Sequence, residues 1–185
     1  MPYLFGEKVR LRAAERSDIS LFVKWVNDPE VTENLMIHFP MSTAEEELWY
    51  DSMLKGPQAE HVNVIEAKVI FEDELVWKPI GNSAFHNISW RVRKAEVGIM
   101  IGEKDFWDKG YGTDAMKVML KHGFETLDLH RIWLQVYDKN IRGMRSYEKA
   151  GFVKEGIFRD GHYQHGRYFD IILMSILKSE WERNQ

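Results

Sequence analysis

The chain has 185 residues, of which 44% are hydrophobic, so we expect one domain over residues 1–185 with a sizeable core. The formal net charge of -4 at pH 7 gives no basic surplus, and we therefore expect no nucleic-acid partner. No run of about 18 apolar residues occurs, which excludes a membrane-spanning helix. The chain contains no cysteine and shows no signal peptide at its start, so we expect a cytoplasmic protein without disulfides or a thiol nucleophile.

Hydrophobic periodicity divides the chain into short strands and amphipathic helices. Apolar and charged residues alternate at residues 9–12, as in a half-buried strand, and Ser42 with Glu45 forms a capping box that opens a helix. Pro29 should end the first helix at Asp28, and an apolar loop follows up to residue 40. The expected strands cover residues 9–12, 62–71, 77–90, 94–102, 131–137, 152–158 and 168–177, and the expected helices cover residues 19–26, 43–55, 111–126 and 140–150.

The order of these elements predicts an α+β fold. The strands between residues 62 and 102 follow one another through short connections, so we expect them to be antiparallel. We therefore predict a mixed, mostly antiparallel central sheet of about seven strands with helices on both faces. This order lacks the repeated βαβ units of a doubly wound dinucleotide-binding fold.

The segment from residue 98 to residue 115 carries the first functional signal. An apolar strand leads into a polar loop with Gly110 and Gly112, and a helical pattern begins there. Glycine permits a tight turn and a close approach of the backbone to a ligand. The unpaired N–H groups and the dipole of a helix N-terminus favour an anion, most often a phosphate. We predict that residues 107–113 hold a phosphate-bearing cofactor.

The residues of this loop leave three interpretations open. In the first, the glycines only allow the backbone to turn between the strand and the helix, without binding a ligand. Residues 110–115 also fit the G-x-G-x-x-A fingerprint of a nicotinamide-binding protein, although that pattern requires its first glycine at the end of a strand. The third interpretation is a loop for the pyrophosphate of an acyl-CoA. A Walker P-loop is excluded because no G-x-x-x-x-G-K-[ST] sequence occurs.

Residues 140–152 carry the second functional signal. On a helix, Asn140, Gly143, Met144 and Tyr147 would share one face. A small residue in that face leaves space for a ligand, and the phenol of Tyr147 would lie at the far end of such a groove. A core-facing stripe with a packed tyrosine would show the same spacing.

The two stretches together resemble the GNAT superfamily of acyl-CoA N-acyltransferases. The resemblance extends over nearly the whole chain and is closest to the branch of the ribosomal-protein N-terminal acetyltransferases and the spermidine acetyltransferases. It implies acetyl-CoA as cosubstrate, an amine acceptor and no metal. The motifs that carry it are Trp107-Asp-Lys-Gly110-Tyr-Gly112, Asn140 followed by Tyr147-Glu-Lys-x-Gly151-Phe152, Ala95-Glu96-x-Gly98 and Leu129-His-Arg-Ile132.

The resemblance also implies a role for each matching position. The strand before the loop would pair with the pantetheine arm, the loop would bind the pyrophosphate, and Tyr147 would protonate the leaving thiolate. Trp107 stands where the family usually has glutamine or arginine. The implied cofactor-binding residues are Ile99, Met100, Ile101, Trp107, Asp108, Lys109, Gly110, Tyr111, Gly112, Thr113, Asn140, Gly143 and Ser146.

An amine must be neutral before it attacks a thioester. At neutral pH this costs roughly 4 kcal/mol for a lysine-like amine and about 1 kcal/mol for an α-amine. Glu96 is the candidate general base because it lies in the strand leading to the carbonyl site, and His86 is the second candidate, although both also fit ordinary strand positions. A backbone N–H near Met100 would stabilise the oxyanion.

For the acceptor we expect a protein N-terminal amine. Polyamine acetyltransferases of this branch carry an acidic cluster after the first helix, whereas residues 35–39 here are mainly apolar. A small-molecule amine, such as a polyamine or an antibiotic, and a non-catalytic acyl-CoA-binding module remain alternatives, and a homodimer is left open. The pair His162 and His165 lacks a nearby third ligand, so we expect no metal site.

Overall fold

The computed structural model describes residues 3–37 and 39–183. Its central feature is an eight-stranded sheet in the order β1-β2-β3-β4-β5-β6-β8-β7, in which only β5 and β6 are parallel neighbours. This confirms the predicted α+β class, and the two-residue β1 is the strand beyond the seven expected. The strands are β1 (Leu4–Phe5), β2 (Val9–Ala13), β3 (Asn63–Phe71), β4 (Glu74–Ser89), β5 (Lys94–Ile101), β6 (Arg131–Tyr137), β7 (Val153–Gln164) and β8 (Arg167–Leu177).

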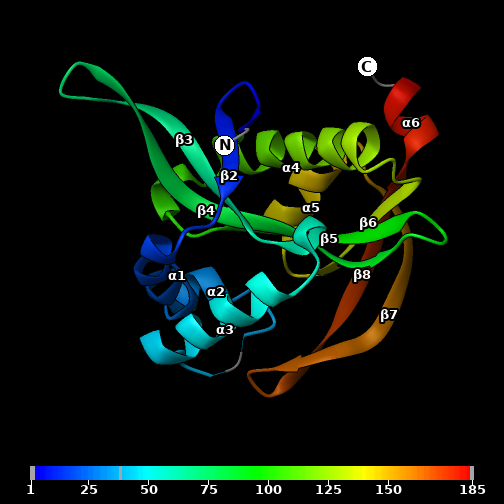
Figure 1. Cartoon of the computed structure of the whole chain (residues 1–185). Coiled ribbons are helices and arrows are strands. Elements are labelled where there is room, and N and C mark those ends of the chain that lie inside the picture. Colours follow the sequence, from blue (N-terminus) through cyan, green and yellow to red (C-terminus); the bar gives the residue numbers. More distant parts are fainter. Residues whose placement is uncertain (1–2, 38, 184–185) are drawn as a thin grey trace.

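Helices cover both faces of this sheet (Figure 1). One layer contains α1 (Ile19–Val26), α2 (Pro29–Thr32) and α3 (Thr43–Lys55), and the other contains α4 (Tyr111–Lys121) and α5 (Ile141–Ala150). The helix α6 (Lys178–Arg183) follows the last strand, and a π-helical turn (His122–Thr126) extends α4. No helix of the described chain is long and apolar enough to cross a membrane.

The hydrophobic core has one part on each face of the sheet, because successive side chains of a strand point to opposite faces. In β5, Val97 belongs to the cluster that contains Met119 of α4. Met100 of the same strand belongs to the cluster that contains Phe22 and Trp25 of α1. The strand β5 is therefore fixed by packing on both faces, which holds its end in place beside the loop that follows.

Two segments differ from the sequence expectation. Residues 31–40 were expected to be irregular, but Asp28 accepts a hydrogen bond from the Glu30 amide at 2.9 Å and starts the short helix α2, which includes residues 31 and 32. The other described residues of this stretch are irregular as expected, and residue 38 lies outside the described residues. The strand expected at residues 152–158 instead continues to Gln164 as β7, with an irregularity where the pairing with β8 shifts between Phe158 and His162. The hairpin therefore extends further from the sheet than predicted.

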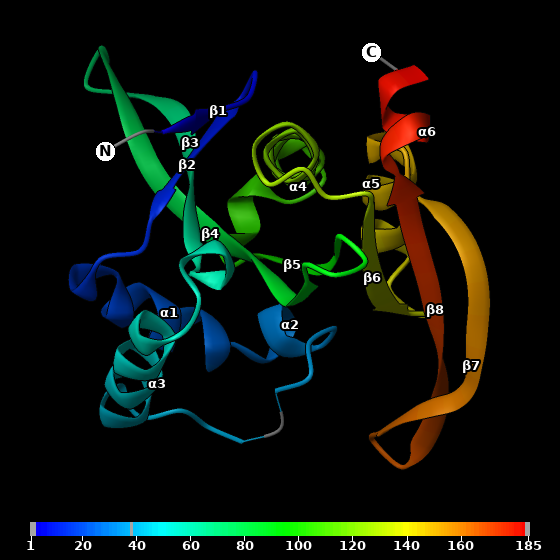
Figure 2. The same ribbon diagram turned by 45° about the vertical axis from the view of Figure 1, so that its right-hand side comes forward.

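The strands β5 and β6 are paired only at their beginnings, from Lys94 opposite Arg131 to Glu96 opposite Trp133. Beyond these residues the two strands separate, and Figure 2 shows β6, β8 and β7 set apart from the other strands. The carbonyl oxygen of Ile80 accepts hydrogen bonds from the amides of Gly102 at 2.8 Å and Glu103 at 3.0 Å, which directs the chain out of β5 into the glycine-containing loop. The separation and the loop together frame the candidate site.

Candidate active site

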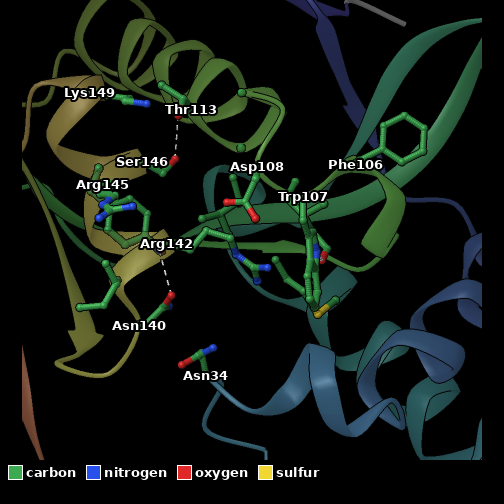
Figure 3. A pocket seen from close by; sticks show the side chains of 18 of the residues that line it. Asn34, Phe106, Trp107, Asp108, Thr113, Asn140, Arg142, Arg145, Ser146 and Lys149 are labelled. Atoms are coloured by element: carbon green, nitrogen blue, oxygen red, sulfur yellow. Dashed lines mark hydrogen bonds between the residues drawn. The ribbon is translucent and has the colours of Figure 1, made fainter.

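A cavity of about 370 Å³ lies between the end of β5 and the first turns of α4 and α5 (Figure 3). Four segments form its walls: the end of β5, the loop into α4, one side of α5, and the segment around α2. The first three walls carry the residues predicted to bind a cofactor. The fourth wall contributes Val31, Asn34 and Leu35, of which only Leu35 belongs to the apolar stretch that the sequence analysis connected with the acceptor.

The structure brings most of the predicted site residues together around this cavity. Lys109 and Tyr111 do not line it: Lys109 Nζ donates to the Asp105 carbonyl at 2.6 Å, and the Tyr111 ring packs on Phe106 with centroids 5.1 Å apart. Their binding roles stay predictions. The predicted residues that line the cavity are Ile99, Met100, Ile101, Trp107, Asp108, Gly110, Gly112, Thr113, Asn140, Gly143, Ser146 and Tyr147.

The start of α4 presents backbone N–H groups to the cavity. Gly110 has a φ of 85°, a left-handed conformation that favours glycine, and it is the N-cap residue of the helix. The Asp114 amide donates to the Gly110 carbonyl at 3.0 Å, so the three amides before Asp114 precede the first intrahelical hydrogen bond. These amides and the helix dipole provide a site for an anion such as a pyrophosphate.

The buried carboxylate of Asp114 fixes this helix start to the beginning of β2. It accepts hydrogen bonds from the amides of Lys8 at 2.7 Å and Val9 at 3.0 Å. The Lys8 ammonium also donates to the Lys109 carbonyl at 2.9 Å. Asp114, a variable position of the dinucleotide fingerprint at residues 110–115, therefore has a structural role, because it anchors the loop.

The start of α5 is capped by its own side chain. Asn140 Oδ1 accepts from the Gly143 amide at 2.9 Å. A Cβ on Gly143 would lie 2.6 Å from Asn140 Nδ2, so this glycine makes room for the cap. The hydroxyls of Thr113 and Ser146 lie 2.9 Å apart and join α4 to α5. The two helix starts are thus held as one unit.

Three cations on α5 line the cavity and were missed by the sequence analysis: Arg142, Arg145 and Lys149. Their spacing of three and four residues is a signal that would have placed them on one side of the helix. The guanidinium carbon of Arg142 lies 3.7 Å from the centroid of the Trp107 ring, and Trp107 Nε1 donates to the Ile101 carbonyl at 2.7 Å. Burial lowers the pKa of Arg142, which nevertheless stays charged at neutral pH.

Tyr147 lines the cavity on the same helix, and its ring packs edge-on against Phe152 with centroids 6.1 Å apart. Burial raises the pKa of Tyr147 to about 12, while the charge of Arg142 acts in the opposite direction. Within the described chain, no hydrogen bond to its hydroxyl is found. The phenol is therefore protonated at neutral pH and available to donate.

Glu96 and His86 lie opposite each other on β5 and β4, outside the lining of the cavity. Glu96 Oε2 accepts from Asn87 Nδ2 at 3.0 Å, and the His86 ring lies over Gly98. The structure does not bring Glu96 together with Tyr147, and its role as a base stays a prediction. Asp108 is the only carboxylate among the described lining residues.

The two histidines of the 162–165 segment have separate surroundings. The ring of His162 stacks on Tyr137 with centroids 4.1 Å apart. His165 Nε2 lies 3.5 Å from a carboxylate oxygen of Glu33. Across residues 3–37 and 39–183, no group of three or more metal-ligating side chains is close enough together to hold a metal ion.

Comparisons with known proteins agree with this geometry. The family model described as an acetyltransferase (GNAT) domain matches residues 8–153. A Bacillus licheniformis protein named "Uncharacterized N-acetyltransferase p20" is 30% identical, with 98% of this chain and 99% of the relative covered. The "Putative ribosomal N-acetyltransferase YdaF" of Bacillus subtilis is 27% identical over 96% of this chain and 95% of its own length. The crystal structure of spermidine N-acetyltransferase from Vibrio cholerae in complex with CoA and spermine matches with a TM-score of 0.81 and 29% identity, over 95% of this chain and 98% of that one.

Proposed function

The chain belongs to the GNAT family of acetyltransferases and is an N-acetyltransferase, and we propose that its acceptor is the N-terminal amine of a protein. One observation carries the proposal: the cavity wall opposite α4 and α5 consists of the uncharged residues Val31, Asn34 and Leu35. Such a wall offers no carboxylate to an amine that carries several charges. An α-amine needs little help, because its deprotonation at neutral pH costs about 1 kcal/mol.

The residues of the other walls fit acetyl-CoA as cosubstrate. The amides at the start of α4 suit a pyrophosphate, and Arg142, Arg145 and Lys149 add positive charge on the neighbouring helix. The backbone of Ile99–Ile101 has no pairing with β6, so its edge towards β6 is open to the pantetheine arm, with the Ile101 carbonyl already accepting from Trp107 Nε1. When bound, acetyl-CoA supplies an activated acetyl thioester.

Tyr147 is the proposed proton donor of the reaction. A phenol whose pKa is raised to about 12 holds its proton at neutral pH and can pass it to a leaving thiolate, whose ordinary pKa is ~8.5. The attacking amine requires no strong base if it is an α-amine. Water or Asp108, the lining carboxylate, can then take up the proton that the amine releases.

A polyamine is the second candidate acceptor. It is favoured by the similarity of the whole chain to the spermidine N-acetyltransferase from Vibrio cholerae, at a TM-score of 0.81. At 27% and 29% identity, the relatives named for a ribosomal and for a spermidine acceptor are about equally distant from this chain.

The two candidates are separated by measuring the release of CoA thiol with acetyl-CoA and a panel of amines. We expect kcat/KM for short peptides with a free N-terminus to exceed that for spermidine at least about tenfold, since the α-amine is the cheaper one to deprotonate. A peptide with a blocked N-terminus and an internal lysine is the control and should react poorly. A higher kcat/KM for spermidine than for every peptide would favour the polyamine function instead.

A further inference from the structure

Three segments that are distant in sequence meet beside the uncharged wall of the cavity. The Lys139 ammonium lies 2.8 Å from Glu33 Oε1 and donates to Gln164 Oε1 at 2.5 Å. It also lies over the Phe169 ring, 4.6 Å from the centroid. On its other side, Glu33 is 3.5 Å from His165 Nε2, at the turn between β7 and β8. The segment after α2, the start of α5 and the end of the hairpin are thereby joined.

We propose that the Glu33–Lys139 ion pair determines acceptor specificity: Lys139 occupies the ammonium site that Glu33 would otherwise offer, so the enzyme disfavours polycationic amines and accepts monocationic α-amines. This inference rests on the function proposed above. It assigns the choice between the two candidate acceptors to one pair of residues.

The position of the pair supports this assignment. Asn34 and Leu35 line the cavity directly after Glu33, and Asn140 lines it directly after Lys139. In Figure 3 the labels of Asn34 and Asn140 mark the part of the cavity where the loop after α2 and the start of α5 both contribute to its lining. Glu33 and Lys139 thus each directly precede, in the sequence, a residue that lines the cavity on the side opposite the start of α4.

The contacts of Lys139 are those by which proteins bind an alkylammonium ligand: a carboxylate, an amide oxygen and the face of an aromatic ring. Only 17% of its side chain is exposed, so the ammonium is held rather than free in solvent. Lys139 in turn holds the pKa of Glu33 below its usual range. The carboxylate is therefore ionised and its charge is already neutralised.

Glu33 is the only carboxylate between Val31 and Ile37. The guanidinium of Arg167 lies over the same Phe169 ring, 4.7 Å from the centroid, which adds a second cation to this region. A polyamine that entered here would meet the ammonium of Lys139, the exposed guanidinium of Arg167 and a carboxylate that is already paired. Like charges held close together in a partly desolvated site lower affinity and so select against such a ligand.

The test uses Lys139→Met, which removes the charge but keeps an unbranched side chain that can pack on Phe169. Binding of spermidine to the complex of the protein with CoA is measured by calorimetry. We expect Lys139→Met to bind spermidine at least about tenfold more tightly than the unmodified chain, because the freed carboxylate can pair with the ligand. Lys139→Arg, which keeps the charge, should differ from the unmodified chain by less than about twofold.

The double variant Glu33→Gln, Lys139→Met decides whether the carboxylate is responsible. The gain in spermidine affinity should disappear in this double variant, and the exposed α4 residue in Lys121→Met serves as a control for loss of a distant positive charge. An unchanged affinity in Lys139→Met, or a gain that persists in the double variant, would overturn the proposal. Thermal unfolding of each variant verifies that it is folded.

This experiment is independent of acetyl transfer, because CoA carries no acetyl group. If the unmodified chain acetylates no peptide, the proposed function fails while the difference in spermidine binding still stands. If peptides are acetylated and spermidine affinity does not respond to Lys139→Met, the specificity proposal fails alone. If the unmodified chain is active, the ratio of kcat/KM for spermidine to kcat/KM for a peptide should rise about tenfold in Lys139→Met.

Discussion

The two sides of the cavity are held together in different ways. On the side of α4 and α5, the helix starts are formed by local caps such as Asn140 with the Gly143 amide, and long-range contacts such as Asp114 with the Lys8 amide fasten them to the rest of the fold. On the opposite side, the key contact joins Glu33 to Lys139, which are 106 residues apart. The site proposed for the cofactor therefore combines local helix-start geometry with tertiary contacts, whereas the region proposed to select the acceptor depends on a tertiary ion pair. Changes on the acceptor side can alter substrate choice without disturbing the helix starts.

The largest effect on activity is expected for Tyr147, which lines the cavity on α5 and would act as the general acid. Tyr147→Phe keeps the ring but removes the proton, and we expect kcat to fall about 100-fold while the Kd for acetyl-CoA changes little. Tyr137→Phe is the matched control, since Tyr137 is buried, has no hydrogen-bond partner for its hydroxyl among the described residues, and does not line the cavity. Turnover, measured as thiol release, should be unchanged in that control.

The pH dependence sharpens the same prediction. Burial raises the pKa of Tyr147 to about 12, so the protonated form persists well above the ~10 of an exposed tyrosine. Rising pH also increases the neutral fraction of the acceptor amine. We therefore expect kcat to rise or stay level up to about pH 10, and a decline centred near pH 8 to 9 would contradict the assignment of the acid to Tyr147.

The next largest effect is expected at Arg142, which connects α5 to the loop through the Trp107 ring. Loss of one charge-assisted contact to a phosphate in Arg142→Ala should raise the KM for acetyl-CoA about tenfold, equivalent to about 1.4 kcal/mol. Acetylated pantetheine lacks the pyrophosphate, so its KM should be the same in both proteins. Arg91→Ala, an exposed charge removed from the cavity lining, is the control. An equal increase in KM for acetyl-CoA and for acetylated pantetheine would mean that Arg142 acts on the thioester end of the cosubstrate.

The two helix starts of the proposed cofactor side could be predicted from the sequence because their signals are local. Gly110 and the cap residue Asn140 act within three or four positions of themselves, and the structure has a helix start at each. The position of Arg142 was not predictable in the same way, because it depends on a ring that reaches across from the loop. The resemblance indicated that the usual side chain was missing at Trp107, but it did not indicate that α5 brings a cation to the same place.

The opposite side and the long hairpin were poorly predictable for the same reason. Asp160 and Gly161 have the residue types of a turn, yet β7 continues through them because Asp170 accepts the Asp160 amide at 2.9 Å. Glu33 has no neighbour in sequence that distinguishes it from an ordinary surface glutamate. Its pairing with Lys139, which is 106 residues away, depends on the tertiary fold and cannot be predicted from the local sequence. Long-range pairing thus hides the features on which acceptor choice is proposed to depend.

The smallest effect concerns Asn140, which the resemblance assigns to the cofactor and the structure shows as the cap of α5. Asn140→Ala should lower the free energy of unfolding by about 1 kcal/mol, because the Gly143 amide loses its acceptor. Asn140→Asp keeps an acceptor and should retain most of that stability, but its charge in the cavity should weaken acetyl-CoA binding about fivefold. Denaturant unfolding and calorimetric titration measure the two effects separately. Unweakened binding in Asn140→Asp would leave Asn140 with capping as its only role, so that the helix start, and not this side chain, binds the cofactor.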